Sequence, residues 1–388
     1  MKIGILTLPL HTNYGGILQA YALQTVLERM GHQTEILQVQ RPRKLSYLCM
    51  PQVYAKRFIK KFVLRRPNTR FFEERWWNQK GIPAMRKYTN HFLKEYLHLR
   101  LIHSIEEVQP FDYDGFVVGS DQVWRKRYFC FAMYTSICDA FLRFAKEWKV
   151  KRIAYAASFG VDTWEYTCEE TVQCASLLQL FDTVAVRETS AVNICKQKMD
   201  VEATQVLDPT LLLVANDYQK LFEKAKIPKS EGDLHCYILD NNPQKQALID
   251  NIAREQRLKP FSVLAPVPMQ IKEATILTQP PVEQWLRAFY DSEFVVTDSF
   301  HACVFSILFR KQFVVYGNQE RGMTRFHSLF SILGLEDRLV YDYSQYKKQI
   351  PIDYDAVYTK LNTWRTKSLE LLNQSMVCLL YTSPSPRD

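Results

Sequence analysis

The sequence predicts an α/β fold with two domains, each built around a parallel β-sheet. The chain has 388 residues, which is too long for one small domain. It opens with an apolar strand at 2–8, a turn containing glycine, a helix with apolar residues at helical spacing over 17–30, and a second strand at 34–39. This order is the opening unit of a parallel doubly wound sheet. A second alternation of strands and helices begins near residue 215.

The first domain is expected to span residues 1–212, and its strands share one property. Each is a short apolar run that ends in polar residues, at the edge where open α/β sheets place their sites. The polar residues at four of these strand ends are Asn13, Asp121, Ser158 and Arg187. We interpret Asp208-Pro209-Thr210 as the turn that closes this domain.

The second domain is expected to span residues 213–352, and a final helix at 353–377 is expected to pack back across both domains. The strands of this domain are predicted at 233–239, 260–264, 294–297 and 312–316. Residues 378–388, CLLYTSPSPRD, depart abruptly from the helical pattern before them. They match what one frame of a common sequencing adaptor encodes, so we interpret them as an artefact and exclude them from the fold.

A basic helical insertion is predicted at about 41–103, where 16 Lys/Arg face only three Glu, a local balance of +13. The rest of the chain therefore carries 9 − 13 = −4. Within the insertion, residues 54–66 place aromatic and aliphatic side chains on one face with cations around them. Three interpretations stay open: contact with an anionic membrane, cover for the cleft of an enzyme with a polyanionic acceptor, or ordinary packing of an amphipathic helix. No nucleic-acid motif accompanies the basic residues, so we expect no nucleic-acid partner.

Composition favours a cytoplasmic protein. No apolar run reaches the length of a membrane-spanning helix, and the N-terminus lacks the features of a signal peptide. Nine cysteines are scattered without metal-ligand spacing, as expected for reduced thiols rather than a disulfide framework. The basic insertion is also compatible with a location at the inner face of the membrane. The sequence predicts neither a metal nor a cofactor, and it does not indicate an oligomeric state.

The stretch VVTDSFHACVFS, residues 295–306, carries the strongest local indication of a site. An apolar strand breaks at Thr297-Asp298-Ser299 and continues directly as a helix, whose first N–H groups favour an anion. His301 lies in the first turn of that helix, where its imidazole reaches the same space. The alternative is structural, with Asp298 or Ser299 as an N-cap and His301 on the surface.

A second local indication is the turn Asn13-Tyr14-Gly15-Gly16 after the first strand. Two glycines allow backbone amides to approach a ligand closely, and the Asn13 side chain can bond to it. The spacing is not GxGxxG, so it does not indicate a dinucleotide. A turn that needs glycine only for its geometry is the alternative.

Several separated motifs, taken together, resemble the polysaccharide pyruvyl transferase family. In chain order they are NYGGILQAYALQ, GSDQVW, AYAASFG, VRE with a following residue pair that includes Ser, VLDPTLLL, TDSFHACVFS and TRFHSLF. The resemblance covers nearly the whole chain. It implies two Rossmann-like domains facing a cleft, a GT-B-like fold, and transfer of a pyruvyl group from phosphoenolpyruvate to sugar hydroxyls as a ketal. Arg125 departs from the pattern, because Asn is common after the tryptophan.

The resemblance and the chemistry of phosphoenolpyruvate together predict roles for single residues. His301 is expected to be the general acid or the electrostatic partner of the phosphate, and Asp121 to accept a proton from the acceptor or orient it. Donor binding is predicted for Arg187, Arg325 and Ser299, because a guanidinium fits carboxylate or phosphate. Acceptor binding is predicted for Asn13, Gly15 and Gly16. For each arginine a structural salt bridge is the alternative, and for Asp121 a helix cap.

The predicted partners are therefore phosphoenolpyruvate, as donor, and a sugar or lipid-linked glycan from the synthesis of a surface polysaccharide or exopolysaccharide. Two other functions are considered. A GT-B-like glycosyltransferase using a nucleotide sugar should show an acidic pair for the ribose in the second domain, which the sequence does not show. A glycan-binding relative without catalysis should show no turnover.

Overall fold

Two parallel β-sheets organise the protein in the computed structural model, which describes residues 1–40, 49–66, 69–264, 273–318, 322–346 and 350–377. In this part of the chain the first sheet has seven strands in the order β3-β2-β1-β4-β5-β6-β7. The second has five, in the order β12-β11-β10-β8-β9. The strand pairs within both sheets are parallel. The predicted α/β fold with two Rossmann-like, GT-B-like halves is thereby confirmed.

The strands are short, as the apolar runs of the sequence predict. Those of the first sheet are β1 Lys2–Leu6, β2 Gln33–Val39, β3 Leu99–Ile102, β4 Gly115–Val118, β5 Lys151–Ala157, β6 Thr183–Val186 and β7 Thr204–Gln205. Those of the second are β8 Leu234–Tyr237, β9 Pro260–Phe261, β10 Phe294–Thr297, β11 Gln312–Tyr316 and β12 Leu339–Val340. The strands β4 and β10 are buried along their whole length, as expected where helices cover both faces of a parallel sheet.

Alternate residues of one strand enter different hydrophobic cores, because successive side chains of a strand point to opposite faces. In β4, Val117 joins the larger core, whereas Phe116 and Val118 join a second core on the opposite face. In β10, Val295 joins the same larger core, and its neighbour Val296 joins a third. One core therefore runs continuously from the first sheet to the second.

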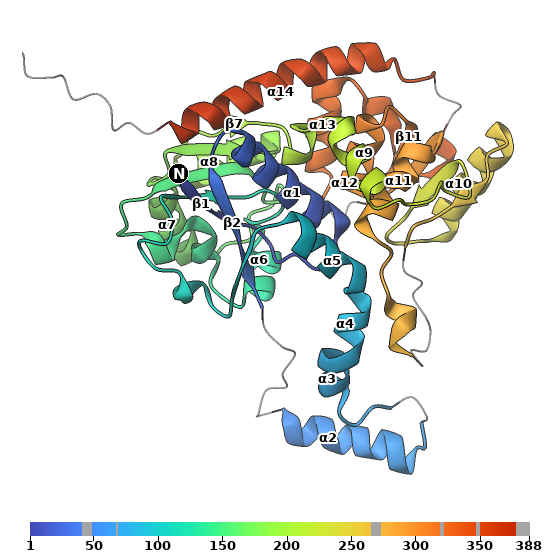
Figure 1. Cartoon of the computed structure of the whole chain (residues 1–388), viewed down its shortest axis with the longest axis horizontal. Helices are drawn as coiled ribbons and strands as arrows, with labels where there is room; N and C mark the ends of the chain where they lie inside the picture. The colour runs from blue at the N-terminus through green and yellow to red at the C-terminus, as the bar shows by residue number, and fades with distance from the viewer. Residues whose placement is uncertain (41–48, 67–68, 265–272, 319–321, 347–349, 378–388) are drawn as a thin grey trace, which may run out of the picture.

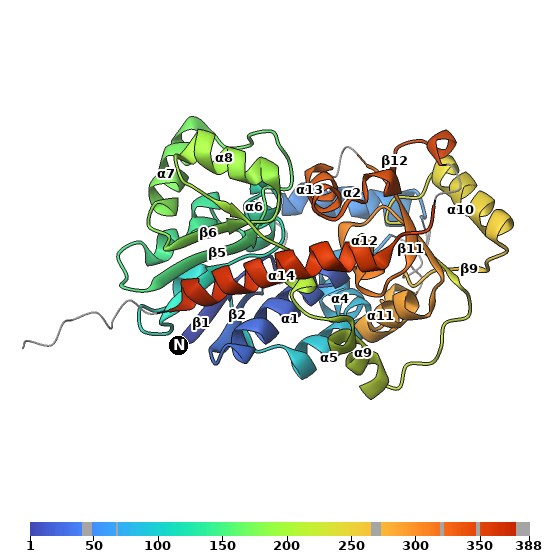
Figure 2. The ribbon, with the colours of Figure 1, turned by 90° about the horizontal axis from the view of Figure 1, so that it is seen from above.

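Helices connect the strands and pack on both faces of each sheet (Figure 2). Their bounds are α1 Tyr14–Arg29, α5 Lys87–Tyr96, α6 Lys126–Met133, α7 Cys168–Leu178, α8 Thr189–Met199, α9 Ala215–Lys224, α10 Pro243–Gln256, α11 Val282–Asp291, α12 Phe300–Leu308 and α13 Thr324–Leu333. No helix among the described residues has both the length and the apolar content needed to cross a membrane.

The basic insertion forms an arm that projects from the body of the protein (Figure 1). The arm contains α2 Met50–Phe58, its π-helical continuation Ile59–Val63, α3 Glu73–Trp76 and α4 Ile82–Met85. Residues 99–102, which the sequence analysis includes in the insertion, instead form β3, the edge strand paired with β2. Their apolar pattern was obscured by the surrounding cations.

The last helix, α14, Tyr354–Met376, crosses from the second sheet to the first (Figures 1 and 2). Near its start the Tyr358 hydroxyl donates to the Leu308 carbonyl, 2.7 Å away, in the second half. Further along, the Ser368 hydroxyl accepts from the Leu207 amide at 3.1 Å, in the first half. The helix thus binds both halves, as the sequence predicts, and the domain boundaries themselves stay a prediction. Residues 378–388 lie outside the described chain.

Candidate active site

The carboxyl ends of β4, β5 and β6 bring polar residues together at one edge of the first sheet. Asp121 follows β4, Ser158 follows β5, and Arg187 follows β6. These strands are neighbours and parallel, so their ends lie side by side. The first turn of α1, which follows β1, lies at the same edge. The second half contributes His301 from α12 and Arg325 from α13.

Six charged or titratable side chains form a buried cluster at this junction, and each residue is at most 8% exposed. We call it the charge cluster. Its members are Asp121, Arg187, Glu188, Asp208, His301 and Arg325. Burying so many charges is costly unless they compensate one another. The cluster therefore needs a close arrangement of opposite charges, and the ion pairs below supply it.

Arg187 is the centre of the charge cluster. One terminal nitrogen lies 2.7 Å from Asp208 Oδ2, and the other lies 3.3 Å from Asp121 Oδ1. Its Nε lies 3.9 Å from a carboxylate oxygen of Glu188. Burial would lower the pKa of Arg187, but these carboxylates outweigh burial and raise it. Its role in binding the donor stays a prediction, and these ion pairs favour its role in holding the carboxylates.

Asp208 lies between Arg187 and His301, although its sequence suggested only a turn. One carboxylate oxygen accepts from the Thr210 amide at 3.0 Å and from its hydroxyl at 2.6 Å. The other oxygen, besides Arg187, faces His301 Nε2 at 3.8 Å. Burial would raise the pKa of Asp208, yet the nearby His301 and Arg187, with the hydrogen bonds from Arg187 and Thr210, hold it below its usual value. Asp208 is therefore ionised and fixed in orientation.

Asp121 combines an unusual backbone with a compensated charge. Its φ is +64°, in the left-handed region that non-glycine residues seldom occupy. Its backbone carbonyl accepts from the Ser158 amide at 3.1 Å, which ties the two strand ends together. Burial would raise the pKa of Asp121, but the charges of Arg187, His301 and Arg325 lower it. The carboxylate is therefore ionised at neutral pH, and it also borders the pocket described below.

His301 lies directly against the first turn of α1. A Cβ added to Gly15 would lie 2.1 Å from His301 Nδ1, so only glycine allows the imidazole this position. The structure thus brings together His301 and the Asn13–Gly16 turn, which are almost 290 residues apart in the sequence. Glycine at position 15 allows the His301 side chain to come close, whereas the sequence suggested that it allows a ligand to come close.

Arg325, in the first turn of α13, lies near the Phe300 ring, as Arg187 does. Its guanidinium is 5.4 Å from the centroid of that ring, and that of Arg187 is 4.9 Å from it. Burial and the nearby charge of Arg187 lower the pKa of Arg325 to about 10, although Asp121 and Glu188 oppose this. An anion bound beside Arg325 would relieve both effects. Its role in binding the donor stays a prediction.

The break before α12 matches the structural alternative only in part, because Ser299 is the N-cap residue but His301 is buried, and the anion site stays a prediction. Asp298 accepts from the Leu239 and Asp240 amides and from Lys245 Nζ at 2.7 Å, so it joins strand ends within the second half. Ser299 is the N-cap, but its side chain makes no capping hydrogen bond. Its amide donates to Thr297 Oγ1 at 3.0 Å. The prediction that Ser299 binds the donor is left untested by this arrangement.

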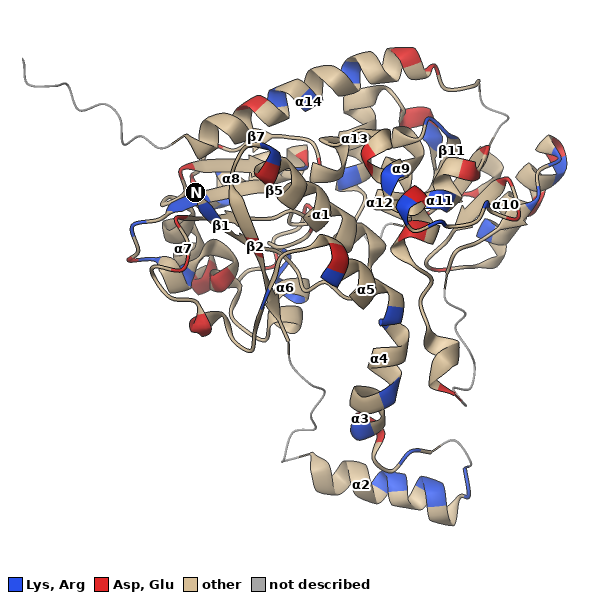
Figure 3. Cartoon of the chain, viewed as in Figure 1, with Lys and Arg blue, Asp and Glu red and all other residues tan. Residues whose placement is uncertain are grey.

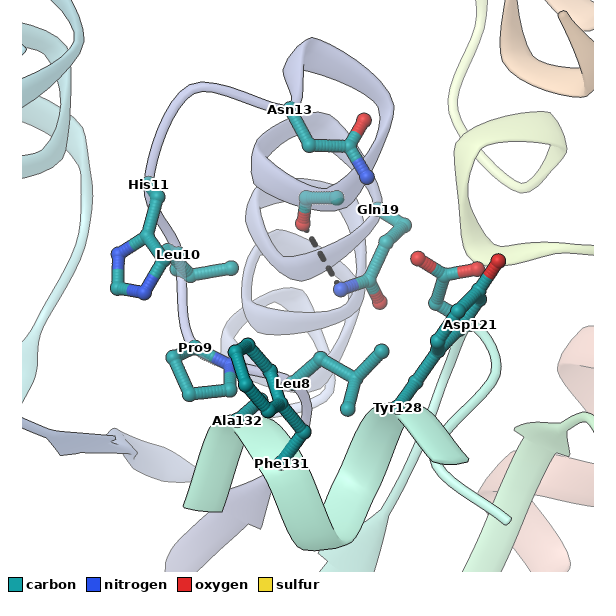
Figure 4. Close-up of a pocket in the computed structure, with 11 residues that line it drawn as sticks. Leu8, Pro9, Leu10, His11, Asn13, Gln19, Asp121, Tyr128, Phe131 and Ala132 are labelled. Atoms are coloured by element: carbon teal, nitrogen blue, oxygen red, sulfur yellow. Dashed lines mark hydrogen bonds between the residues drawn. The ribbon is translucent and has the colours of Figure 1, made fainter. Parts of the chain in front are cut away.

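A pocket of about 220 Å³ adjoins Asp121 (Figure 4). Asn13, the N-cap residue of α1, and Gln19 within that helix line one side, and Tyr128 and Phe131 of α6 line another. Gly16 also lines it, and Gln19 Nε2 donates to the Gly16 carbonyl at 2.8 Å. The remaining lining is mostly apolar, from residues 8–11 and Ala132. Such a mixture of amide, carboxylate and aromatic groups suits a sugar.

Gln19 connects α1 to the GSDQVW loop, and the sequence analysis assigned it no role. Its Oε1 accepts from the Ser120 amide at 3.1 Å and from the Ser120 hydroxyl at 2.6 Å. Its Nε2 also donates to Thr7 Oγ1 at 3.1 Å. A buried glutamine within an apolar helix is an indication that could have identified it, since buried amides are normally bonded.

Asp208 and Glu188 are the other site residues that the predictions omitted. Glu188 is fully buried, and its Oε1 accepts from the Ser158 hydroxyl at 2.7 Å. Both acidic residues stand in quoted motifs, VRE and VLDPTLLL, directly after strands. An acidic residue at a buried strand end is therefore as strong an indication of a site residue as the histidine at a helix start. Among the described residues, no group of three or more His, Cys, Asp or Glu is placed to hold a metal ion.

A family model described as Polysaccharide pyruvyl transferase matches residues 13–320, most of the chain. The chain belongs to this family. The matched region contains Asp121, Arg187, Asp208 and His301, whereas Arg325 lies just beyond its end. This family membership confirms the resemblance on which the predicted roles depend, while the roles of single residues remain predictions.

Comparison with other proteins adds no near relative. A search of curated proteins finds no match to this chain. Among solved structures, UGT89C1 of Arabidopsis thaliana complexed with UDP-L-rhamnose is 8% identical, with a TM-score of 0.49, covering 97% of this chain and 99% of that chain. UDP-GlcNAc 2-epimerase from Neisseria meningitidis bound to UDP-GlcNAc is 11% identical, with a TM-score of 0.44, covering 96% of this chain and 94% of that chain.

Proposed function

We propose that the protein transfers the pyruvyl group of phosphoenolpyruvate to hydroxyls of a sugar in a surface polysaccharide or exopolysaccharide precursor, forming a pyruvate ketal. The observation that carries this proposal is the placement of His301. In a chain of the pyruvyl transferase family, this imidazole faces the ionised Asp208 and lies against α1, whose Asn13 and Gly16 line a pocket.

The donor is a small dianion or trianion, so its site needs positive charge in a buried setting. Arg325 supplies a guanidinium that is 8% exposed and whose pKa is lowered to about 10. The start of α12 adds backbone N–H groups and the positive end of a helix dipole. We place the phosphate or carboxylate of phosphoenolpyruvate between these two features, beside Ser299.

His301 then acts as the general acid. Protonation of the methylene carbon of phosphoenolpyruvate makes the adjacent carbon electrophilic, and a sugar hydroxyl adds to that carbon and releases its proton. Phosphate leaves with the electrons of its C–O bond, and a second hydroxyl adds in the same way to close the ketal. The carboxylate of Asp208 lies 3.8 Å from His301 Nε2 and helps to orient the imidazole for this step.

The acceptor sugar is placed in the pocket beside Asp121. The amide of Asn13 and the carboxylate of Asp121 can bond to hydroxyls, and Tyr128 offers an aromatic face. A carboxylate whose pKa is lowered is a weak base, so Asp121 is better suited to orient the hydroxyl than to remove its proton. Gly15 contributes to this site indirectly, because the absence of a side chain there leaves room for the imidazole of His301.

The decisive experiment combines the purified protein, phosphoenolpyruvate and glycan precursors from the host. Phosphate release that requires glycan, with a pyruvate-sized mass increment on the glycan, is the expected result. His301→Ala should lower turnover about 100- to 10,000-fold, as expected for loss of a general acid, with an unchanged circular dichroism spectrum. His98→Ala is the matched control, since His98 is exposed and pairs with Glu28 outside the site.

Three other results would contradict the proposal. Near-normal turnover by His301→Ala would remove His301 from the chemistry. Consumption of a nucleotide sugar without phosphate release from phosphoenolpyruvate would indicate a glycosyltransferase. Glycan binding without any turnover, unaffected by His301→Ala, would indicate a relative that has lost catalysis.

A further inference from the structure

The arm formed by the basic insertion exposes apolar side chains to an unusual degree. At the end of α2, in its continuation and at the residue after it, five aromatic or aliphatic residues are between 49% and 64% exposed. We call them the arm patch: Phe58, Ile59, Phe62, Val63 and Leu64. The rings of Phe58 and Phe62 lie 4.9 Å apart, so the patch is contiguous. A contiguous exposed apolar patch on a projecting element indicates an interaction surface.

A neighbouring part of the α2 surface packs against the rest of the arm. The Tyr54 ring lies 5.1 Å from that of Phe71, and Arg57 pairs with Glu74 at 2.6 Å and Glu73 at 3.0 Å. These contacts hold α2 against α3 and leave the arm patch facing away from it. The orientation of the helix is therefore fixed by its own partners, and the exposure of the patch is a property of the folded arm.

Cations surround the arm patch. Residues 50–66 contain six Lys or Arg and no Asp or Glu, and Figure 3 shows blue without red along α2. The exposed members are Lys56, Lys60, Lys61, Arg65 and Arg66. Lys61 Nζ lies 5.5 Å from the centroid of the Phe62 ring, so charge and apolar surface are interleaved. This pattern is typical of a helix lying in the interface of an anionic membrane.

We propose that the arm patch docks on the surface of an anionic phospholipid bilayer, with the aromatic and aliphatic side chains below the headgroups and the cations among them. A second copy of the chain fits this surface poorly, because apposed arms would bring like charges together. Nucleic acid also fits poorly, since Ile59, Val63 and Leu64 offer no ring to stack on bases.

The arm also reaches the proposed acceptor pocket at its root. Arg86 lies between α4 and α5, and together with burial its charge lowers the pKa of His11 to about 4. His11 lines that pocket. From the second half, the Gln279 amide donates to the Met85 carbonyl at 3.2 Å. If the acceptor is lipid-linked, which rests on the proposed function, docking through the arm holds the protein at the membrane that carries the acceptor.

Vesicle sedimentation tests the docking without donor or acceptor, so its result is independent of the catalytic proposal. The full chain should sediment with phosphatidylcholine vesicles that contain phosphatidylglycerol, and much less with phosphatidylcholine alone or at high salt. Lys60→Glu with Lys61→Glu should lower the partition coefficient at least tenfold, since each cation near such a surface contributes about fivefold. Phe58→Ser with Phe62→Ser should also lower it at least tenfold.

The matched control variants make the same kinds of substitution at positions outside the arm. Phe111→Ser removes an aromatic side chain that is 99% exposed, and Lys146→Glu with Lys149→Glu makes the same change in net charge on another surface. Both should bind as the unchanged protein does. Sedimentation with neutral vesicles alone, equal loss in the controls, or no sedimentation would overturn the proposal. A dimer in solution that Phe58→Ser with Phe62→Ser dissociates would assign the patch to a second copy instead.

Discussion

At the scale of single residues, the site depends on how a few buried charges balance. The charge cluster holds three carboxylates and two guanidinium groups, so these five groups leave one negative charge in excess. Arg187 lies within 4 Å of all three carboxylates and compensates most of this buried charge. Removing its guanidinium would leave the carboxylates without their shared partner, which is costly in a buried site.

Two adjacent glycines test whether the position of His301 matters for turnover. Gly15→Ala would place a methyl group 2.1 Å from His301 Nδ1, so the imidazole must move. We expect a fall in kcat of at least about 100-fold, because a small misplacement can cost that much. In Gly16→Ala the nearest atom is Asn13 Nδ2 at 3.2 Å, on an exposed side chain that can shift.

Steady-state kinetics of the two variants should separate the roles of these glycines. Gly16→Ala is expected to change the KM for the acceptor while leaving kcat within a few-fold, because the pocket wall changes and His301 does not. Helix propensity favours both replacements by up to about 1 kcal/mol, whereas the clash at Gly15 opposes it, so denaturant unfolding of each variant is needed to separate a loss of turnover from a loss of folding. Equal kcat values for Gly15→Ala and the unchanged protein would show that His301 tolerates displacement.

The sequence identified His301 because it lies in the first turn of a helix that directly follows a buried strand, a place that favours an anion. It did not identify Asp208, because Asp-Pro is equally common in turns that carry no chemistry. Local pattern could not show that Asp208 meets an imidazole 93 residues later in the chain, since only the packing of the two halves brings them within 3.8 Å. Long-range partners of this kind require the fold.

At the scale of elements, strand periodicity and helix ends predicted most of the strands and helices, but not the short edge strands β3 and β12. The helix predicted at 353–377 is observed as Tyr354–Met376, and the strand predicted at 294–297 as Phe294–Thr297. The edge strand β3 was missed because its sequence, LRLI, alternates apolar and basic residues inside a region dominated by cations. Its assignment depends on pairing with β2, which the local sequence does not show.

Strand β8 carries a buried histidine that should make stability depend on pH. His235 is fully buried against Phe261 and Phe289, and burial lowers its pKa to about 3. In the unfolded chain the ordinary value is 6.5, so the unfolded state binds the proton first as the pH falls. Stability is therefore complete above pH 6.5 and declines below it, by about 2 kcal/mol at pH 5.

Denaturant unfolding at pH 7 and pH 5 measures this effect. His235→Leu should reduce the difference in unfolding free energy between the two pH values by about 2 kcal/mol, because the titrating group is gone. His98→Leu changes an exposed histidine and should leave the difference as it was. A pH dependence that survives in His235→Leu would mean that other groups produce it.

At the scale of the whole molecule, the two sheets share a hydrophobic core and a helix. The larger core contains Ile5 of the first sheet, Val295 of the second and Leu361 of α14. In addition, the Thr189 amide of α8 donates to Ser328 Oγ of α13 at 3.1 Å. Domains joined only by a flexible connection unfold separately, whereas these halves share buried apolar contacts. The site at their junction thus depends on their mutual packing.

Leu361→Ala tests this continuity. Leu361 is fully buried in the shared core, and its truncation should lower the free energy of unfolding by about 2–5 kcal/mol. Because the core belongs to both halves, calorimetry should show one unfolding transition that moves to lower temperature without splitting. Thr366→Ala, an exposed position on the same helix, should leave the transition within a degree or two. Two transitions, of which Leu361→Ala moves only one, would mean that each half folds independently and that the charge cluster assembles only after both have folded.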